Sequence, residues 1–309
     1  MIEDDSWKLT VRADTLRLRA RMIRAIRRFF LDRNFLEIET PLRIPAPAPE
    51  SHIDAVASGA WFLHTSPELC MKRLLAAGYS RIFQICKCFR AGERGDRHLP
   101  EFTMLEWYRA GADYRILMDD CEALINTVAR EIGLDGVVSW QGRRIGLEAP
   151  WKRISVRDAF ARYATISAAE ALSTDRFDEL LACEVEPRLG MDVPVFLYDY
   201  PVEQGALARV TEGDPGIAER FELYIAGMEL ANAFSELIDA GEQRRRFEEA
   251  SRNRQRKGSP VYPMPERFLQ ALPRMSPSAG IALGVDRLVM LFADKPRIDD
   301  VVAFTPESL

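Results

Sequence analysis

The sequence has no apolar run that approaches the roughly 20 residues of a membrane-spanning helix. Its first residues include the acidic Glu3, Asp4 and Asp5, which is unlike a signal peptide. Basic residues are not in excess, because 42 Lys and Arg stand against 47 Asp and Glu, for a net charge of -5. A strongly basic nucleic-acid-binding surface is therefore missing overall, and we expect a cytoplasmic protein without membrane contact.

Cysteine is also scarce, with five residues at irregular spacing. Cys86 and Cys88 form a Cys-x-Cys pair, but no second Cys or His pair follows at zinc-finger spacing. We therefore interpret these cysteines as small apolar side chains on a buried strand in a reducing compartment, with a metal site as the alternative.

Hydrophobic periodicity predicts an α+β fold in one domain over residues 1–309. Apolar residues recur at helical spacing over 14–33, with Asp14 as a candidate cap and an arginine-rich opposite face. Residues 81–90 and 101–108 alternate as strands joined by a loop, which favours an antiparallel pair. Further strands are expected over 35–41, 193–200, 220–225 and 229–237, and further helices over 113–133, 175–189 and 242–257, after Ser155 and after Gly284.

The strand over 101–108 carries the first candidate site. Phe102, Glu106 and Tyr108 share one face with Met104. This face offers a ring for stacking, and a carboxylate and a phenol for a cation. Arg90 ends the partner strand, and its guanidinium suits a phosphate or carboxylate. A half-exposed sheet with incidental charges is an equally good interpretation of these residues alone.

The hairpin predicted over 220–237 carries three carboxylates. Glu222 and Glu229 face each other across its turn and could hold Mg²⁺ between substrate phosphates. Glu236 could receive an ammonium group, and Asn232 shares its face. Carboxylates on buried strands are costly unless they meet cations, although an exposed hairpin would avoid that cost.

A glycine-rich segment near the C-terminus suggests an anion site. Gly280 and Gly284 flank a short strand, and Arg287 falls in the first turn of the helix that follows. The helix dipole and the free N–H groups of this turn favour a bound phosphate.

These segments resemble, in order, the signature motifs of class II aminoacyl-tRNA synthetases. The similarity is greatest to the lysyl-tRNA synthetase catalytic domain and runs from about residue 14 to the C-terminus. The first motif resembles residues 35–41, the second 89–108 and the third 280–288. The stretches 98–108 (HLPEFTMLEWY) and 229–237 (ELANAFSEL) are typical of the lysine branch. The resemblance implies an antiparallel sheet flanked by helices, ATP and Mg²⁺ as reactants, and a homodimer formed through the first motif.

The resemblance also implies residue roles. Arg90 would grip the α-phosphate and the amino acid carboxylate, and Arg287 the γ-phosphate; these two are the catalytic candidates. Phe102 would stack on adenine, while Glu222 and Glu229 would serve Mg²⁺ and the nucleotide. Two further ATP-site candidates are Glu93 and His98. The amino acid site would comprise Ser66, Glu68 at the α-amino end, Ala231, Asn232 near the carboxylate, and the ammonium pocket of Glu106, Tyr108 and Glu236.

Three departures from the synthetase pattern narrow the family. The catalytic pattern starts almost at the N-terminus, where synthetases carry an anticodon-binding OB-fold. Ala231 and Ala233 replace the glycines around the asparagine, and their methyl groups would reshape the amino acid site. Glu93 stands one position along from the family glutamate, and Leu99 replaces an asparagine. A truncated form with alanine before the asparagine resembles the elongation factor P–lysine ligases.

That resemblance implies activation of (R)-β-lysine, or lysine, as its adenylate and transfer to a lysine ε-amine of elongation factor P. The arginine-rich face of the first helix and the helix over 244–257 are candidate docking surfaces. One alternative is a truncated synthetase that charges tRNA or another RNA, against which the acidic balance argues. Another is a silent lysine- or ATP-binding regulator, which would not need to retain the phosphate and metal groups.

Overall fold

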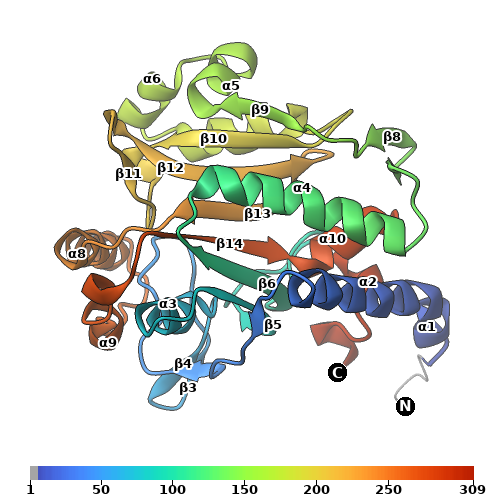
Figure 1. The fold of residues 1–309 in the computed structure, drawn as a ribbon, viewed down its shortest axis with the longest axis horizontal. Helices are drawn as coiled ribbons and strands as arrows, with labels where there is room; N and C mark the ends of the chain where they lie inside the picture. Colours follow the sequence, from blue (N-terminus) through green and yellow to red (C-terminus); the bar gives the residue numbers. More distant parts are fainter. Residues whose placement is uncertain (1–5) are drawn as a thin grey trace.

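A nine-stranded sheet forms the centre of the computed structural model, which describes residues 6–309 (Figure 1). In this sheet β1 is parallel to β5 and β10 is parallel to β9, while all other neighbouring strands pair antiparallel. This confirms the predicted α+β class with a largely antiparallel sheet. The order is β1 (Leu36–Glu37), β5 (Arg81–Phe89), β6 (Glu101–Ala110), β14 (Ser278–Gly284), β13 (Met228–Ser235), β12 (Asp214–Ile225), β10 (Val195–Pro201) and β9 (Lys152–Ser155), and β11 (Val210–Thr211) pairs with β12.

Three helices cover one face of this sheet: α2 (Ala13–Leu31), α4 (Tyr114–Glu131) and α10 (Val285–Phe292) (Figure 1). The strand residues that meet them include Phe83, Leu105 and Trp107, and these pack with helix residues such as Phe30. Because side chains alternate along a strand, the intervening residues face the opposite side, where the candidate site residues lie.

The opposite face is covered at one end by α3 (Glu68–Ala76), α8 (Ala240–Arg256) and α9 (Glu266–Leu269), whose apolar residues pack around Ile82 and Tyr108. A small sheet of β2 (Arg43–Ile44), β4 (Trp61–Leu63) and β3 (Ala57–Ser58) precedes α3. The remaining elements are α1 (Ser6–Val11), the hairpin β7 (Val137–Trp140) and β8 (Arg143–Gly146), α5 (Val156–Tyr163), α6 (Ala168–Ser173), α7 (Phe177–Leu180), and short 3-10 turns at Glu186–Arg188, Val202–Gln204, Leu272–Arg274, Ile298–Val301 and Pro306–Ser308.

Three local predictions need correction. The strand expected over 35–41 is reduced to Leu36–Glu37: the Ile38 N–H still donates to the Phe83 carbonyl, but residues 39–41 form no ladder pair with β5. The helix expected over 175–189 breaks into α7, a π-helical turn at Leu181–Val185 and a 3-10 turn that contains Pro187. Asp14 does not cap α2, whose N-cap is Arg12; Asp14 instead pairs with Arg17 in the first turn.

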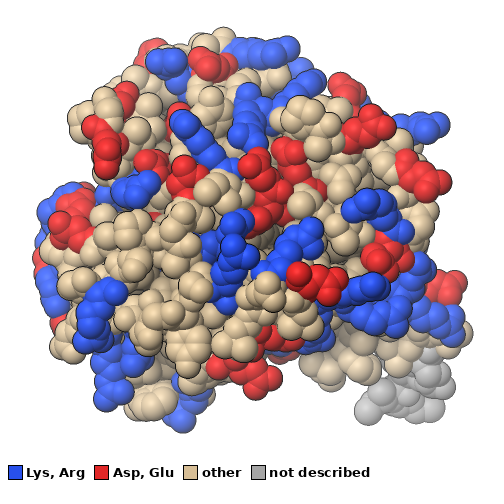
Figure 2. Space-filling view, viewed as in Figure 1, with Lys and Arg blue, Asp and Glu red and all other residues tan. Residues whose placement is uncertain are grey.

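No helix within residues 6–309 combines the length and apolar character needed to cross a membrane. Figure 2 shows acidic and basic side chains interspersed over the face that carries α2 and α4, without a large area of one sign.

Candidate active site

The two predicted carboxylate groups lie in one row across the sheet. Glu106 of β6 pairs with Ala282 of β14, Ala282 with Asn232 of β13, and Asn232 with Glu222 of β12. Cα partners in register point to the same face, so this row joins the two groups. Three strand spacings separate Glu106 from Glu222, or about 14 Å. The row is therefore long enough to contact both ends of one extended ligand.

Glu106 lies at the centre of one end, which we call the amino acid end. The Ser66 hydroxyl donates to its Oε1 at 2.5 Å, and the Tyr108 hydroxyl donates to its Oε2 at 2.9 Å. Burial, and then the charge of Glu68, raise the pKa of Glu106 well above its ordinary value. Among residues 9–309, whose side chains are described, no basic side chain forms an ion pair with this carboxylate. A substrate ammonium group would supply the missing positive charge.

The side chain of Lys72, on α3, also lies at the amino acid end. Lys72 was not among the predicted site residues. Its ammonium group forms ion pairs with Glu68 and Glu236, and the Lys72 side chain is 1% exposed. Burial alone would lower the pKa of Lys72, but Glu236 and Glu68 raise it above its ordinary value. Burial raises the pKa of Glu236 to about 8, despite the opposing effect of Lys72. The i,i+4 spacing from Glu68 was the available sequence signal.

Gly280 leaves room for this arrangement. A Cβ atom at this position would overlap the ring of Tyr108 and the carboxylate of Glu236. Only glycine lets both side chains lie over β14, so its place in the third motif has a steric reason.

The other end of the site, which we call the nucleotide end, contains Arg90 and Arg287, the two residues predicted to bind phosphate. The Arg90 guanidinium lies 5.1 Å from the centre of the Phe102 ring and 3.7 Å from a carboxylate oxygen of Glu93. Arg287 donates from Nη1 to the carbonyl of Glu229 at 2.9 Å and lies 3.3 Å from its carboxylate. The Arg287 Nη2 is also 2.6 Å from Nε2 of His98.

Two neighbouring residues of the second motif, His98 and Leu99, have different surroundings. Burial, and then Arg287, lower the pKa of His98, which favours a neutral imidazole that can accept a hydrogen bond. Leu99, the residue that replaces the family asparagine, is 3% exposed and packs in the core beneath the helices. Its side chain is thus directed away from the nucleotide end.

Glu222 and Glu229 lie on neighbouring strands, as predicted for a metal pair. Glu222 accepts hydrogen bonds of 2.6 Å from Tyr200, Tyr224 and Arg220. Burial and the charge of Glu222 raise the pKa of Glu229. Mutual repulsion of this kind is relieved by a divalent cation, and oxygen donors are those that Mg²⁺ prefers. The donor set therefore fits Mg²⁺.

Two further carboxylates join the site without having been predicted. Burial, and then Glu222 and Glu229, raise the pKa of Glu186 to about 7, and the Tyr224 hydroxyl lies 3.1 Å from it. Burial also raises the pKa of Glu50 to about 7, against the opposing charge of Arg90. Glu50 comes from an irregular segment, and Glu186 from a 3-10 turn where the predicted helix over 175–189 is broken, so neither strand parity nor regular helical spacing could have placed them.

Ala231 and Ala233 lie on the helix-covered face of β13, whereas Asn232 faces the site. Asn232 accepts a hydrogen bond of 3.2 Å from Arg220. The two methyl groups thus contact the core instead of the amino acid pocket, contrary to the sequence-based expectation. They can act on the site only through the position of the β13 backbone.

Comparison with known proteins agrees with this geometry. Residues 7–308 match the family model of class II tRNA synthetases (D, K and N). The chain is 41% identical to an elongation factor P–(R)-β-lysine ligase of Pectobacterium carotovorum, with 99% of each chain covered. Proteins of the same name from Avibacterium paragallinarum (38% identical, covering 99% of this chain and 100% of that one) and Edwardsiella ictaluri (40%, covering 97% of each) are similar. The chain therefore belongs to the class II tRNA synthetase family, and within it to the elongation factor P–(R)-β-lysine ligases.

Proposed function

We propose that this protein activates (R)-β-lysine, or less readily lysine, with ATP and transfers the acyl group to a lysine ε-amine of elongation factor P. The row from Glu106 to Glu222 carries the proposal, because it joins a buried ammonium pocket to a phosphate- and metal-binding end. The printed names of the relatives supply the acceptor.

In the first half-reaction, an oxygen of the amino acid carboxylate attacks the α-phosphorus of ATP. A new O–P bond forms, the bond to the β-phosphate bridging oxygen breaks, and pyrophosphate leaves with that electron pair. Arg90 would hold the reacting carboxylate and the α-phosphate, and Arg287 would hold the departing phosphates. Mg²⁺ held by Glu222 and Glu229 would neutralise phosphate charge. The residues act by position and charge, and no protein nucleophile is needed.

In the second half-reaction, a neutral ε-amine of the acceptor attacks the acyl carbon. An amide bond forms, the acyl–oxygen bond to AMP breaks, and the amine releases its proton. The residues of the amino acid end determine which amino acid is activated, since Glu106, Tyr108 and Ser66 form a polar pocket for one distal ammonium group. A substrate without that group would leave these buried polar atoms unpaired.

The acceptor is acidic and shaped like tRNA, so an arginine-rich surface suits it. Arg24, Arg27 and Arg28 are exposed on α2, although Arg27 pairs with Glu37 at 2.8 Å and Arg28 lies 3.7 Å from Asp32. The α8 helix is a second candidate docking surface. We further propose a homodimer, by analogy with the class, and a cytoplasmic location, where translation factors act.

The intact mass of elongation factor P tests this function after incubation with the protein, Mg-ATP and (R)-β-lysine, with bulk tRNA present. A mass gain on the factor alone supports the proposal. Acylated tRNA with unmodified factor would instead favour a minimal synthetase. Absence of both products, together with no ATP–pyrophosphate exchange, would favour a regulator that only binds its ligands.

A further inference from the structure

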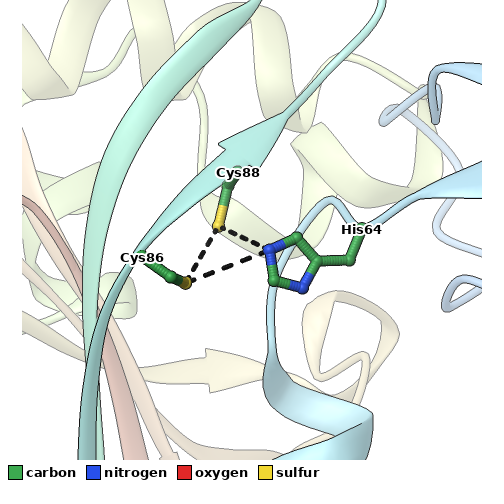
Figure 3. A group of neighbouring side chains, drawn as sticks. All are labelled: His64, Cys86 and Cys88. Atoms are coloured by element: carbon green, nitrogen blue, oxygen red, sulfur yellow. Dashed lines mark hydrogen bonds between the residues drawn. The ribbon is translucent and has the colours of Figure 1, made fainter. Parts of the chain in front are cut away.

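Three metal-binding side chains meet beside the amino acid end, and the proposed reaction uses none of them. His64 follows β4, while Cys86 and Cys88 lie on β5. The Nε2 of His64 is 3.9 Å from the Sγ of each cysteine, and the two Sγ atoms are 3.9 Å apart. Figure 3 shows this nitrogen directed at both sulfur atoms. In the described chain, 6–309, it is the one group of three or more His, Cys, Asp or Glu donors whose ligand atoms all lie within 4.8 Å of one another.

The spacing of these donors suits a tetrahedral metal ion. Bonds of about 2.3 Å to sulfur and about 2.0 Å to nitrogen, at tetrahedral angles, put the donor atoms roughly 3.5–3.8 Å apart. The 3.9 Å separations exceed this only slightly. An ion could therefore bind after a contraction of a few tenths of an ångström, without movement of the backbone.

The donor atoms also define the kind of ion. Two sulfur atoms and an imidazole nitrogen suit thiophilic ions such as Zn²⁺ and Cu⁺, and do not suit Mg²⁺. His64 is 1% exposed and Cys88 is fully buried, so water has little access to compete for the ion. The thioether sulfur of Met104 lies 3.9 Å from Cys88 Sγ and adds a further soft atom to this cluster.

We propose that His64, Cys86 and Cys88 bind one thiophilic metal ion, which fastens the segment before α3 to β5. The Phe89 N–H already donates to the His64 carbonyl at 3.0 Å, and the ion would add a side-chain link at the same place. His64 Nε2 lies 2.7 Å from the Lys87 carbonyl oxygen and donates its N–H to that oxygen, so metal binding requires this proton to leave Nε2 and the ring to turn from the carbonyl toward the two sulfur atoms. Ser66 and Glu68 follow directly, so the ion would hold one wall of the amino acid end. This site stands independently of the proposed function.

Metal analysis of the untagged full-length protein tests the site. The reduced protein is incubated with Zn²⁺ or, in parallel, with Cu⁺, passed through a desalting column and analysed by elemental mass spectrometry. We expect about one ion per chain in the wild type and in the Cys183→Ser control, whose cysteine is exposed elsewhere. The Cys86→Ser/Cys88→Ser double variant should lose at least about nine-tenths of the ion, as expected when two of three ligands are removed.

X-ray absorption of the loaded wild type gives the same answer without any variant, which covers the case of a double variant that misfolds. Sulfur and nitrogen neighbours at metal–ligand distances support the proposal. It is overturned if the wild type retains neither ion, if the folded double variant retains as much metal as the wild type, or if the absorption spectrum shows no sulfur ligand.

Discussion

Lys72 of α3 forms an ion pair with Glu236 at the end of β13, and their side chains are 1% and 0% exposed. The same ammonium group also contacts Glu68. One internal cation is therefore shared by two of the three carboxylates at the amino acid end. Glu106 is the carboxylate left without an ion pair in the described residues, which favours it as the main partner of a substrate ammonium group.

Replacing Lys72 tests how much this internal cation contributes. Lys72→Met leaves Glu68 and Glu236 buried without a counter-ion, so the free energy of unfolding should fall by about 3–5 kcal/mol. Urea denaturation followed by circular dichroism measures the change. Lys257→Met, at an exposed position, is the control and should change stability little. A loss below about 1 kcal/mol for Lys72→Met would show that the pair contributes little.

Glu229→Gln tests the metal-binding end. Removing one of two neighbouring carboxylates should raise the Mg²⁺ concentration needed for half-maximal activity and slow ATP–pyrophosphate exchange by about 10²-fold or more. The exchange rate is measured across a Mg²⁺ titration. Glu212→Gln, at an exposed position, should behave as the wild type. An unchanged Mg²⁺ requirement would remove Glu229 from the metal site.

Phe102→Leu tests whether ATP binding and amino acid binding depend on different residues. Loss of the aromatic ring removes stacking of about 0.5–1.5 kcal/mol, so the KM for ATP should rise about 2- to 10-fold. The KM for the amino acid should change less, because Phe102 stands four residues, or about 13 Å, from Glu106 along β6. Steady-state exchange assays give both constants, with the exposed Phe304→Leu as control. An equal rise in both constants contradicts a specific stacking role.

Glu186→Gln should change the pH dependence of stability. Burial raises the pKa of Glu186 from 4.5 to about 7 in the folded protein. The folded state therefore keeps a proton that the unfolded state releases between these values, and stability falls as the pH rises through this window. With partial solvent access taken into account, the variant should be about 1–2 kcal/mol more stable at pH 8 and similar to the wild type at pH 4.

Urea denaturation at both pH values, without Mg²⁺, makes this comparison. The exposed Glu248→Gln should show no such difference between pH 4 and pH 8. If Glu186→Gln gained equally at both pH values, its effect would come from something other than ionisation.

Charge reversal on α2 tests the proposed docking surface. Exchanging Arg24, Arg27 and Arg28 for glutamate should slow acyl transfer to elongation factor P about tenfold at low salt, and adenylate formation should be unaffected. Single-turnover transfer and ATP–pyrophosphate exchange are measured separately. Arg144→Glu, on the exposed part of β8, is the control. Unchanged transfer would exclude this face and leave α8 as the remaining candidate.

Much of the local structure and of the site could be predicted because the signals are short in range. Alternation placed Phe102, Glu106 and Tyr108 on one face of β6, and the structure confirms the antiparallel pairing of this strand with β5. The helix after Gly284 and the hairpin around Gly227 were likewise encoded by neighbouring residues. The roles of individual site residues could be predicted because their segments also resemble the motifs of a known family.

The sequence by itself thus determined the strands that carry the site, their polar faces and the chemical types of group available there. Only the tertiary structure decided which distant groups meet. It brought Lys72 between Glu68 and Glu236, and it directed Leu99 into the core. It also placed His64 against Cys86 and Cys88, which no zinc-finger spacing could indicate. The physical reason is that strand parity fixes the face on which a side chain lies, whereas its partners depend on strand order, register and the segments packed above the sheet.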